Sequence, residues 1–393
     1  MTEYTWAFDR SFLVFLMIAF VSIAIAARVR SLIPMPLIYG VLFAAGFALK
    51  FLPADMLLSA NMIAVGTIAF NVLVIHSGTM IDLKMLAVQK KEAMVCLVSA
   101  LVLVIGGMAL IPVIGKDLAM VSPGSVIGGG ASCAIASRWV VDKNPGISVF
   151  PWLIFMFQGL FSVPVVTWAL KRESRRLLGE FRSADRQEKR GRPESRERTA
   201  FCEKIPSRYK STAYYLGIIM IVTVINNILH ATVLSGLNIN PNLTALIFGC
   251  ILGSLGLMDK APLFKSDSYG LLILGLMGLM ANTLAGYTWK ELVSFLPPLL
   301  LVFAVSTLLL ILCGIVGARI CHFSPERGIA LTMNCMMGFP VNSMLTEQAA
   351  SIGETDAERG YIKSQIGPVL GMGTMLISNA VSIVIVSVMV IFV

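Results

Sequence analysis

The stretch Ile127-Gly128-Gly129-Gly130-Ala131-Ser132-Cys133-Ala134 lies inside an uncharged segment, 118–137, which also contains Pro123 and Gly124. Glycine has no side chain to restrict the backbone, so three adjacent glycines favour a break in a helix and a close approach to a ligand. Backbone groups left unpaired in hydrocarbon are costly, and a break at membrane depth therefore has to be buried or line a cavity. The stretch predicts an interrupted helix or a re-entrant hairpin.

A second segment, 328–346, has the same character. It contains Gly328 and is centred on Asn334-Cys335-Met336-Met337-Gly338-Phe339-Pro340-Val341-Asn342-Ser343. Proline removes one backbone donor and frees a carbonyl. We expect a second interrupted helix or hairpin here.

The remaining uncharged runs suit membrane spans. Hydrophobic residues make up 57% of the chain and charged residues only 13%, whereas a soluble domain carries roughly 25% charged residues. A span needs about 20 apolar residues. The runs are 11–27, 31–49, 57–81, 93–115 and 144–170, followed by 211–258 (divided at the turn-rich 235–242), 268–289, 292–318 and 364–393.

The number of spans and interrupted segments predicts a fold. Each half has five spans and one interrupted segment, so the sequence predicts an all-α membrane protein. If neither interrupted segment crosses as a simple helix, each half crosses an odd number of times, and the halves have inverted topology. We expect repeat 1 at 1–170, a linker at 171–210 and repeat 2 at 211–393.

The basic residues orient this arrangement. The linker holds 14 of the 31 Lys and Arg and 7 of the 22 Asp and Glu, and thus +7 of the net charge of +9. Cytoplasmic loops of membrane proteins are rich in Lys and Arg. With the N-terminus outside, 25 basic residues fall inside and 6 outside. We predict a multi-pass inner-membrane protein with both termini outside and the linker in the cytoplasm.

Other function classes find little support. A basic stretch can bind nucleic acid, but here it fits a topogenic loop, with a lipid-headgroup or partner site as the alternative. The chain has no GxSxG, HExxH or Walker A motif, so an enzyme is not expected. Its seven cysteines contain no CxxC pair, and we predict no disulfide framework, metal cluster or cofactor.

The interrupted segments are the predicted site. Helix ends at a break direct N–H groups and partial positive charge inward, which suits a carboxylate. Unwound carbonyls and neutral side chains suit Na⁺, and the alternative for the glycines is close helix packing. The candidate substrate or ion ligands are Gly128, Gly129, Gly130, Ala131 and Ser132 in the first segment and Gly338, Phe339, Asn342, Ser343 and Thr346 in the second, with sodium at Ser132, Asn334 and Asn342.

Isolated polar residues extend this set. Asn71 and Asn282 lie in matching spans of the two halves, as do Gln158 and Asn379. Such residues either face a cavity or join helices through hydrogen bonds. His76 is either a proton relay or a structural residue.

The chain resembles the bacterial glutamate:sodium symporter family and its relatives, which include the 2-hydroxycarboxylate carriers. Ile33–Gly40 resembles the proline-containing start of the family's second helix, and Phe70–Gly78 its third helix. Gly128–Ser132 and Gly338–Ala350 resemble its two glycine motifs. Gly130 and Ala131 stand where the family's first motif has His and Gly.

The resemblance implies a function. It implies two oppositely entering hairpins, an elevator-type core that moves against a dimerised scaffold, and Na⁺ coupling. We therefore expect a homodimeric sodium symporter for a small carboxylate or amino acid. The alternatives are a proton-coupled carrier or an exporter of another solute on the same fold, and a channel.

Overall fold

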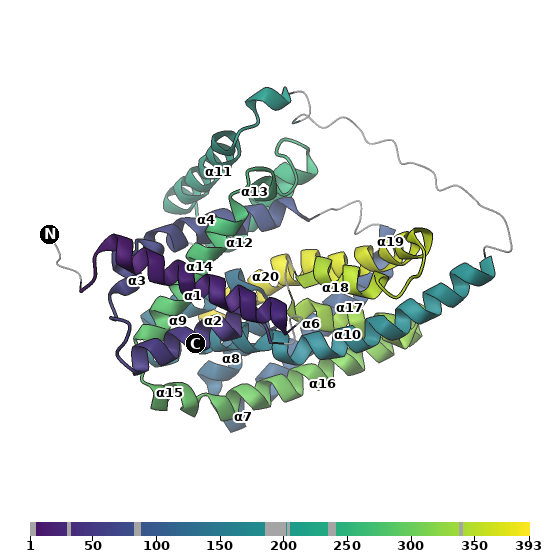
Figure 1. Cartoon of the computed structure of the whole chain (residues 1–393), viewed down its shortest axis with the longest axis horizontal. Helices are drawn as coiled ribbons and strands as arrows, with labels where there is room; N and C mark the ends of the chain where they lie inside the picture. The colour runs from purple at the N-terminus through teal and green to yellow at the C-terminus, as the bar shows by residue number, and fades with distance from the viewer. Residues whose placement is uncertain are drawn as a thin grey trace.

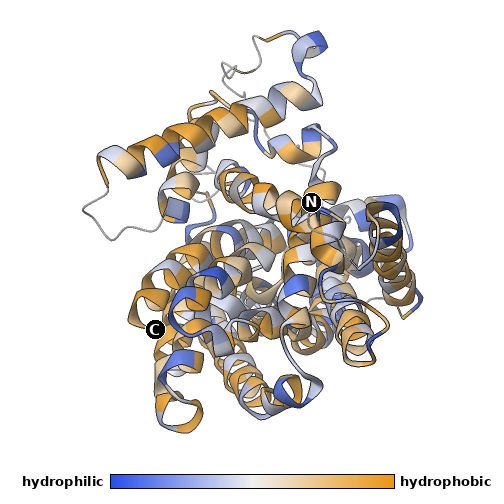
Figure 2. Cartoon of the chain, turned by 90° about the vertical axis from the view of Figure 1, so that its left-hand side faces the viewer, coloured by the Kyte–Doolittle hydropathy of each residue, from blue (hydrophilic) through white to orange (hydrophobic). Residues whose placement is uncertain are grey.

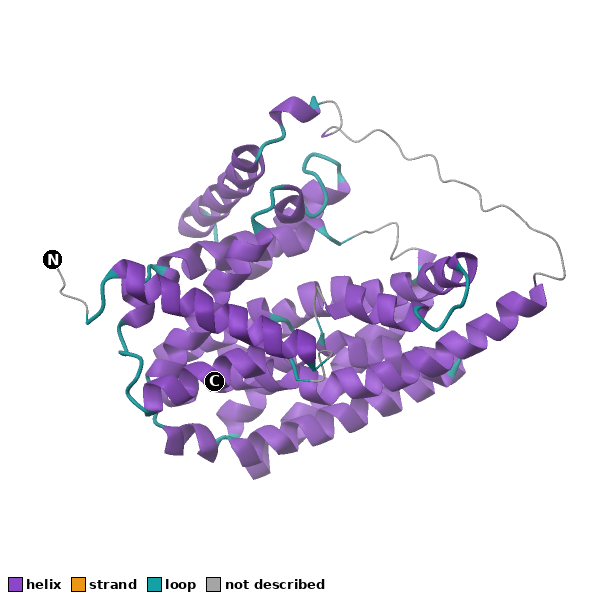
Figure 3. Ribbon diagram, viewed as in Figure 1, coloured by secondary structure: helices purple, strands orange, loops and turns teal. Residues whose placement is uncertain are grey.

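The computed structural model describes residues 5–29, 33–81, 88–184, 202, 205–234, 241–337 and 341–393. Within these residues all regular structure is helical (Figure 3).

The first half of the chain forms one helix or helical pair for each predicted segment. The elements are α1 (Phe8–Arg28), α2 (Met35–Ala48), α3 (Met56–Ser59), α4 (Met62–Thr79), α6 (Lys90–Ala109), α7 (Ile111–Ile114), α8 (Lys116–Val126), α9 (Gly130–Lys143), the short 3-10 helix η1 (Pro145–Ile147) and α10 (Phe150–Ala184).

The second half follows the same order. Its elements are η3 (Ser207–Tyr209), α11 (Thr212–Thr232), α12 (Pro241–Ser254), α13 (Pro262–Lys265), α14 (Tyr269–Ala285), α15 (Trp289–Ser294), α16 (Leu296–Cys321), α17 (Pro325–Met333), η4 (Asn334–Met336), α18 (Val341–Ala350), α19 (Asp356–Met372), the π-helix η5 (Gly373–Val381), α20 (Ser382–Met389) and η6 (Val390–Phe392).

The helices have the length and composition of membrane spans. Among the described residues, seven helical stretches are long and apolar enough to cross a bilayer, and α2, α12 and α14 are shorter apolar helices. Many large apolar side chains are exposed, among them Leu13, Phe20, Ile221 and Leu308, and Figure 2 shows hydrophobic residues along most helices. An apolar exterior of this extent suits lipid, and the chain is an all-α multi-pass membrane protein.

The helices pack into two groups (Figure 1). In the first, which we name the α4 group, α4 packs along α12 and α14, with α1, α2, α3, α11 and α13 around them. In the second, the α10 group, α16 packs along α17 and α6, while α10 contacts α8, α9 and α17, and α19 and α20 complete the bundle. The first three spans of each half thus lie in the α4 group, and the main helices described after them lie in the α10 group.

Glycine allows α4 to sit close to both of its neighbours. A Cβ on Gly78 would overlap backbone atoms of Leu246 and Gly249 in α12, and one on Gly66 would overlap the carbonyl of Gly275 in α14. Small residues of this kind let membrane helices approach closely and gain van der Waals contact. The centre of the α4 group therefore depends on backbone-to-backbone packing.

Two pairs of neighbouring helices run antiparallel. Along α4 and α14, Gly66 faces Gly275, whereas the earlier residue Met62 faces the later residue Gly278. Along α6 and α16, Lys91 donates from Nζ to the carbonyl of Cys321 at 3.2 Å. Further along α6, Gly106 faces Leu309 of α16.

The sixth helix extends beyond its predicted end. α10 continues to Ala184, 14 residues past the expected start of the linker at 171. Leu177 and Leu178 are buried, and Arg182 donates from Nε to Glu358 of α19 at 2.7 Å. The charged residues after 170 do not mark the end of the helix. They pair with each other and with α19, and the helix continues through them.

The two ends of the bundle are distinct in Figure 1. α1 begins and η6 finishes toward the left of the view, whereas α10 finishes at the far right.

The carbonyls of Val390 and Ile391 are capped by Lys143, whose Nζ lies 3.0 and 2.9 Å away.

We expect Gly78→Ala to destabilise the protein by about 1–3 kcal/mol, because the new methyl group meets backbone that cannot move aside. Gly217→Ala is the matched control, since a Cβ at Gly217 meets nothing within 4 Å. Thermal unfolding of the detergent-solubilised protein should show a lower melting temperature for Gly78→Ala only. Equal melting temperatures would contradict the close packing of α4 on α12.

Candidate functional site

The first interruption separates α8 from α9. α8 ends at Val126, Ile127 and Gly128 form a bend, and α9 begins at Gly130 with Gly129 as its N-cap. The prediction of an interrupted segment within 118–137 is therefore confirmed for the backbone.

The glycines of this interruption have different surroundings. A Cβ on Gly128 would overlap the Ser132 side chain, and one on Gly130 would press on Leu276 of α14 and Phe155 of α10. A Cβ on Gly129 would meet nothing within 4 Å. The start of α9 thus borders open space at Gly129 and contacts the α4 group through Leu276.

The second interruption follows α17. After Met333 the chain tightens into the 3-10 turn η4, and Met337 is extended, with φ −125° and ψ 143°. α18 resumes at Val341. The predicted ligands Gly338 and Phe339 lie outside the described residues, as does Pro340.

Asn334 and Asn342 meet at this interruption. Their Nδ2 atoms donate to the carbonyl of Leu370, at 2.7 and 3.4 Å, and both also donate to the Thr374 hydroxyl. Because a carbonyl can only accept, these bonds fix the orientation of both amides. Their Oδ1 atoms are then buried without a partner among the described residues, which is costly unless a ligand or ion occupies the position.

The continuous helical segment formed by α19, η5 and α20, which we name the last helix, donates hydrogen bonds to the backbone of the second interruption. Thr374 Oγ1 donates to the carbonyl of Met337 at 3.2 Å. Ser378 Oγ contacts the same carbonyl at 3.1 Å and that of Cys335 at 2.6 Å. The two hydroxyls therefore satisfy the carbonyls of Cys335 and Met337, which the interruption leaves without helical partners.

The same helix reaches the first interruption. Ser382 Oγ donates to the carbonyl of Ser378 at 2.7 Å and lies 2.7 Å from Ser132 Oγ at the start of α9. Since Ser382 has already given its hydrogen to Ser378, Ser132 is the donor to Ser382. Thr374, Ser378 and Ser382 recur every four residues and form a polar ladder that joins the two interruptions.

The ladder coincides with irregular helix geometry. Pro368 lies inside α19, and residues Gly373–Val381 form a π-helix. Proline and a widened turn both disturb the regular backbone bonding, and π-turns are frequent at functional sites. Gly373 lies against Asn334, because a Cβ there would be 3.2 Å from Asn334 Nδ2.

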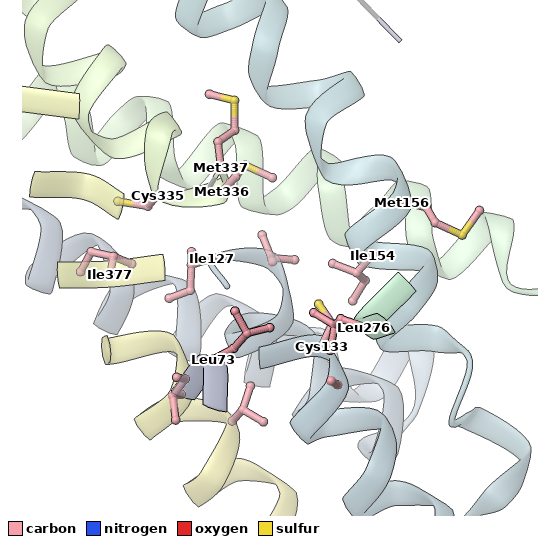
Figure 4. Packing of buried hydrophobic residues seen from close by; sticks show 14 of the residues in the cluster. Leu73, Ile127, Cys133, Ile154, Met156, Leu276, Cys335, Met336, Met337 and Ile377 are labelled. Carbon is pink, nitrogen blue, oxygen red and sulfur yellow. The ribbon is translucent and has the colours of Figure 1, made fainter. Parts of the chain in front are cut away.

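The surroundings of both interruptions are apolar. Figure 4 shows Ile127 and Cys133 from the first, Met336 and Met337 from the second, and buried side chains that include Leu73, Ile154 and Leu276 around them. A low-dielectric environment strengthens the polar bonds that are made and raises the cost of those that are not.

The other predicted ligands are scattered. Thr346 Oγ1 donates to the carbonyl of Asn342 at 2.8 Å, and Gln158 is buried with Oε1 unpartnered among the described residues. Asn282, Asn379 and Ala131 are partly buried, and among the described side chains no hydrogen bond joins Gln158, Asn282 or Asn379 to either interruption. The side chains of Asn71 and Ser343 lie outside the described residues.

His76 belongs to the α4 group. Its ring packs against Phe264 and Tyr269, and Nδ1 accepts a 3.4 Å bond from the N–H of Leu263. These contacts place the His76 ring against the connection between α12 and α14, and its Nε2 is buried without a partner among the described residues.

Sequence inspection missed Thr374, Ser378 and Ser382. They lie in the apolar run 364–393, where single hydroxyl residues are common. The available signal was their four-residue spacing after Pro368, which places them on one face of a helix.

Charged groups lie elsewhere. Glu173 accepts from Ser324 at 2.6 Å, Arg327 pairs with Glu92 at 2.7 Å, and Lys210 pairs with Asp259 at 2.9 Å. Burial alone would raise the pKa of Asp259, but hydrogen bonds from Lys265 and Lys210 outweigh it and leave the pKa below its ordinary value. No group of three or more His, Cys, Asp or Glu in the described chain could hold a metal ion.

Comparisons with known proteins add no family to this description: no protein-family model matches the chain, and no curated protein matches it.

Proposed function

We propose that the chain is a secondary active transporter that couples Na⁺ to the uptake of a small carboxylate or amino acid. One observation carries the proposal. Two interrupted helices, one from each half of the chain, are joined by the ladder of the last helix, beside two buried amide oxygens that have no partner among the described residues. Such paired interruptions at membrane depth are typical of substrate and ion sites in carriers.

The ion would bind at the second interruption. Oδ1 of Asn334 and Oδ1 of Asn342 would be its neutral oxygen ligands, and Thr374, which accepts from the Nδ2 of both amides, donates to the carbonyl of Met337 in the same turn. Neutral oxygens at an unwound turn suit Na⁺. Ser132, the third predicted sodium ligand, would instead hold the start of α9 in place through Ser382.

The substrate carboxylate would bind at the first interruption. The first helical bond of α9 runs from Cys133 N–H to the carbonyl of Gly129, so the three preceding N–H groups have no acceptor within the helix. The open space at Gly129 lies before these groups. Free N–H groups and the helix dipole favour an anion without a lysine or arginine.

Two inverted repeats, 1–170 and 211–393, account for the packing. In an inverted arrangement each helix runs opposite to its counterpart. α4 and α14 are counterparts in chain order, and so are α6 and α16; both pairs are antiparallel neighbours. Counterparts also have matching lengths, with 21 residues in α1 and α11 and 14 in α2 and α12.

An elevator-type movement would displace the α10 group against the α4 group. Both interruptions lie in the α10 group, and Gly130 borders Leu276 of the α4 group. Among the described residues, the side-chain hydrogen bonds between the groups both involve Tyr287, to the carbonyl of Pro145 and to Ser148. A boundary with few polar bonds favours sliding, and the resemblance further implies a homodimer through the less mobile group.

The positive-inside topology is consistent with the ion pairs. Each pair among the described residues joins charges that this topology assigns to the cytoplasmic side, for example Arg327 with Glu92 and Lys210 with Asp259. We therefore retain the assignment of the linker to the cytoplasm and of both termini to the outside of a bacterial inner membrane.

Uptake into proteoliposomes tests the proposal. We expect saturable uptake driven by an inward Na⁺ gradient for at least one member of a panel of amino acids, dicarboxylates and tricarboxylates. Uptake driven by a pH gradient without Na⁺ would support the proton-coupled alternative. Uptake driven only by an outward Na⁺ gradient would support an exporter. Ohmic current in a planar bilayer would support a channel.

Asn334→Ala should weaken activation by Na⁺ by about tenfold or more, since losing one ligand worth about 1.4 kcal/mol has that effect. Asn226→Ala is the matched control, because Asn226 is also buried and donates to a backbone carbonyl, that of Pro241 at 3.1 Å. The measurement is uptake against Na⁺ concentration. An unchanged half-saturating concentration in Asn334→Ala would remove Asn334 from the ion site.

Gly129→Val should abolish uptake while the protein still inserts and melts normally. The φ of −85° at Gly129 suits any residue, and the new side chain enters the open space that we assign to the substrate. Gly360→Val is the control, because a Cβ there also meets nothing within 4 Å. Full uptake by Gly129→Val would place the substrate elsewhere.

A further inference from the structure

Two cysteines that are far apart in the sequence meet beside the second interruption. Cys96 lies in α6 and Cys335 in η4, and their Sγ atoms are 4.0 Å apart. Both side chains are buried, with 0% and 1% of their surface exposed. A disulfide requires a separation of about 2.05 Å, so each sulfur would have to move by only about 1 Å.

The thiol pair lies next to the proposed ion site. Cys335 follows Asn334 directly, and its carbonyl accepts the 2.6 Å bond from Ser378. α6 packs along α16 in the α10 group. A bond between the two sulfurs would therefore tie the proposed ion-binding turn covalently to α6.

We propose that Cys96 and Cys335 form a redox-sensitive site whose oxidation closes a disulfide and locks the second interruption. The oxidant is a small, membrane-permeant hydroperoxide. The first sulfur attacks the peroxide oxygen and becomes a sulfenic acid as water leaves; the second sulfur displaces the sulfenic oxygen as a second water. Two thiols and one hydrogen peroxide thus give one disulfide and two waters, with two electrons passing to the peroxide.

Because the two cysteines lie in different halves of the chain, formation of the disulfide can be measured without an uptake assay. Cys96 belongs to the first half of the chain and Cys335 to the second, and the linker separates them in sequence. A specific protease site inserted between residues 190 and 191 allows the purified full-length protein to be cut into these halves. On a denaturing gel, a disulfide keeps the cut halves together, and reductant releases them.

The bond assay uses the cut protein after treatment with hydrogen peroxide or diamide. We expect a reductant-sensitive band at the mass of the uncut chain, and peptide mass spectrometry should show the Cys96–Cys335 link. Cys96→Ser and Cys335→Ser should each abolish the band. Cys133→Ser is the control and should retain it, because the Cys133 thiol contacts the carbonyl of Ser125 at 3.5 Å and no second thiol among the described residues.

The outcomes separate clearly. Separate halves after oxidation, or a link that persists in either Cys96→Ser or Cys335→Ser, would overturn the proposal. If one serine variant fails to fold, the other still decides the result, since each removes one half of the pair.

The effect on uptake rests on the proposed function, whereas the bond assay does not. Oxidation should lower Na⁺-driven uptake at least tenfold, and dithiothreitol should restore it, in the unmodified protein but not in Cys335→Ser. A link that forms without changing uptake would disprove the lock and leave the transport proposal intact. Absence of uptake before oxidation would count against transport alone.

Discussion

The requirement that every backbone N–H and carbonyl find a partner away from water governs this structure. Within a bilayer an interrupted helix can persist only where protein groups replace the lost helical bonds. Here Ser378 and Thr374 donate to the carbonyls of Cys335 and Met337. The last helix therefore makes the second interruption possible, and its own π-helical segment places those hydroxyls at the turn.

The ladder has a mechanical consequence. Ser132 at the start of α9 is bonded to Ser382, and Ser382 to the Ser378 carbonyl. Both interruptions are therefore bonded to the same helix, and moving one of them would also move the other. In the elevator-type movement that we propose, two interruptions held in this way would travel as one unit with the α10 group.

The sequence predicted the order of the elements better than their details. Glycine and proline located both interruptions, because glycine loosens the backbone and proline removes one of its donors, and both effects are local and visible in the sequence. Charge misplaced the end of α10, since Glu173 and Arg182 are paired across helices with Ser324 and Glu358. Such tertiary pairing leaves no local signature. The ladder was missed although its residues recur every four positions, because a serine or threonine in an apolar run shows its partner only after folding.

The lack of charged partners at the two interruptions suggests why the proposed symporter would couple an ion to its substrate. In the part of the chain that the structure describes, no lysine or arginine hydrogen-bonds to either interruption, so a carboxylate at Gly129 would rely on helix N–H groups alone. Opposite charges attract strongly where the dielectric constant is low. A Na⁺ held by Asn334 and Asn342 would supply the missing positive charge, and the anion would in turn increase the affinity for Na⁺ by the same factor. Cotransport would then follow from electrostatics, because each ligand alone leaves an uncompensated charge in an apolar site.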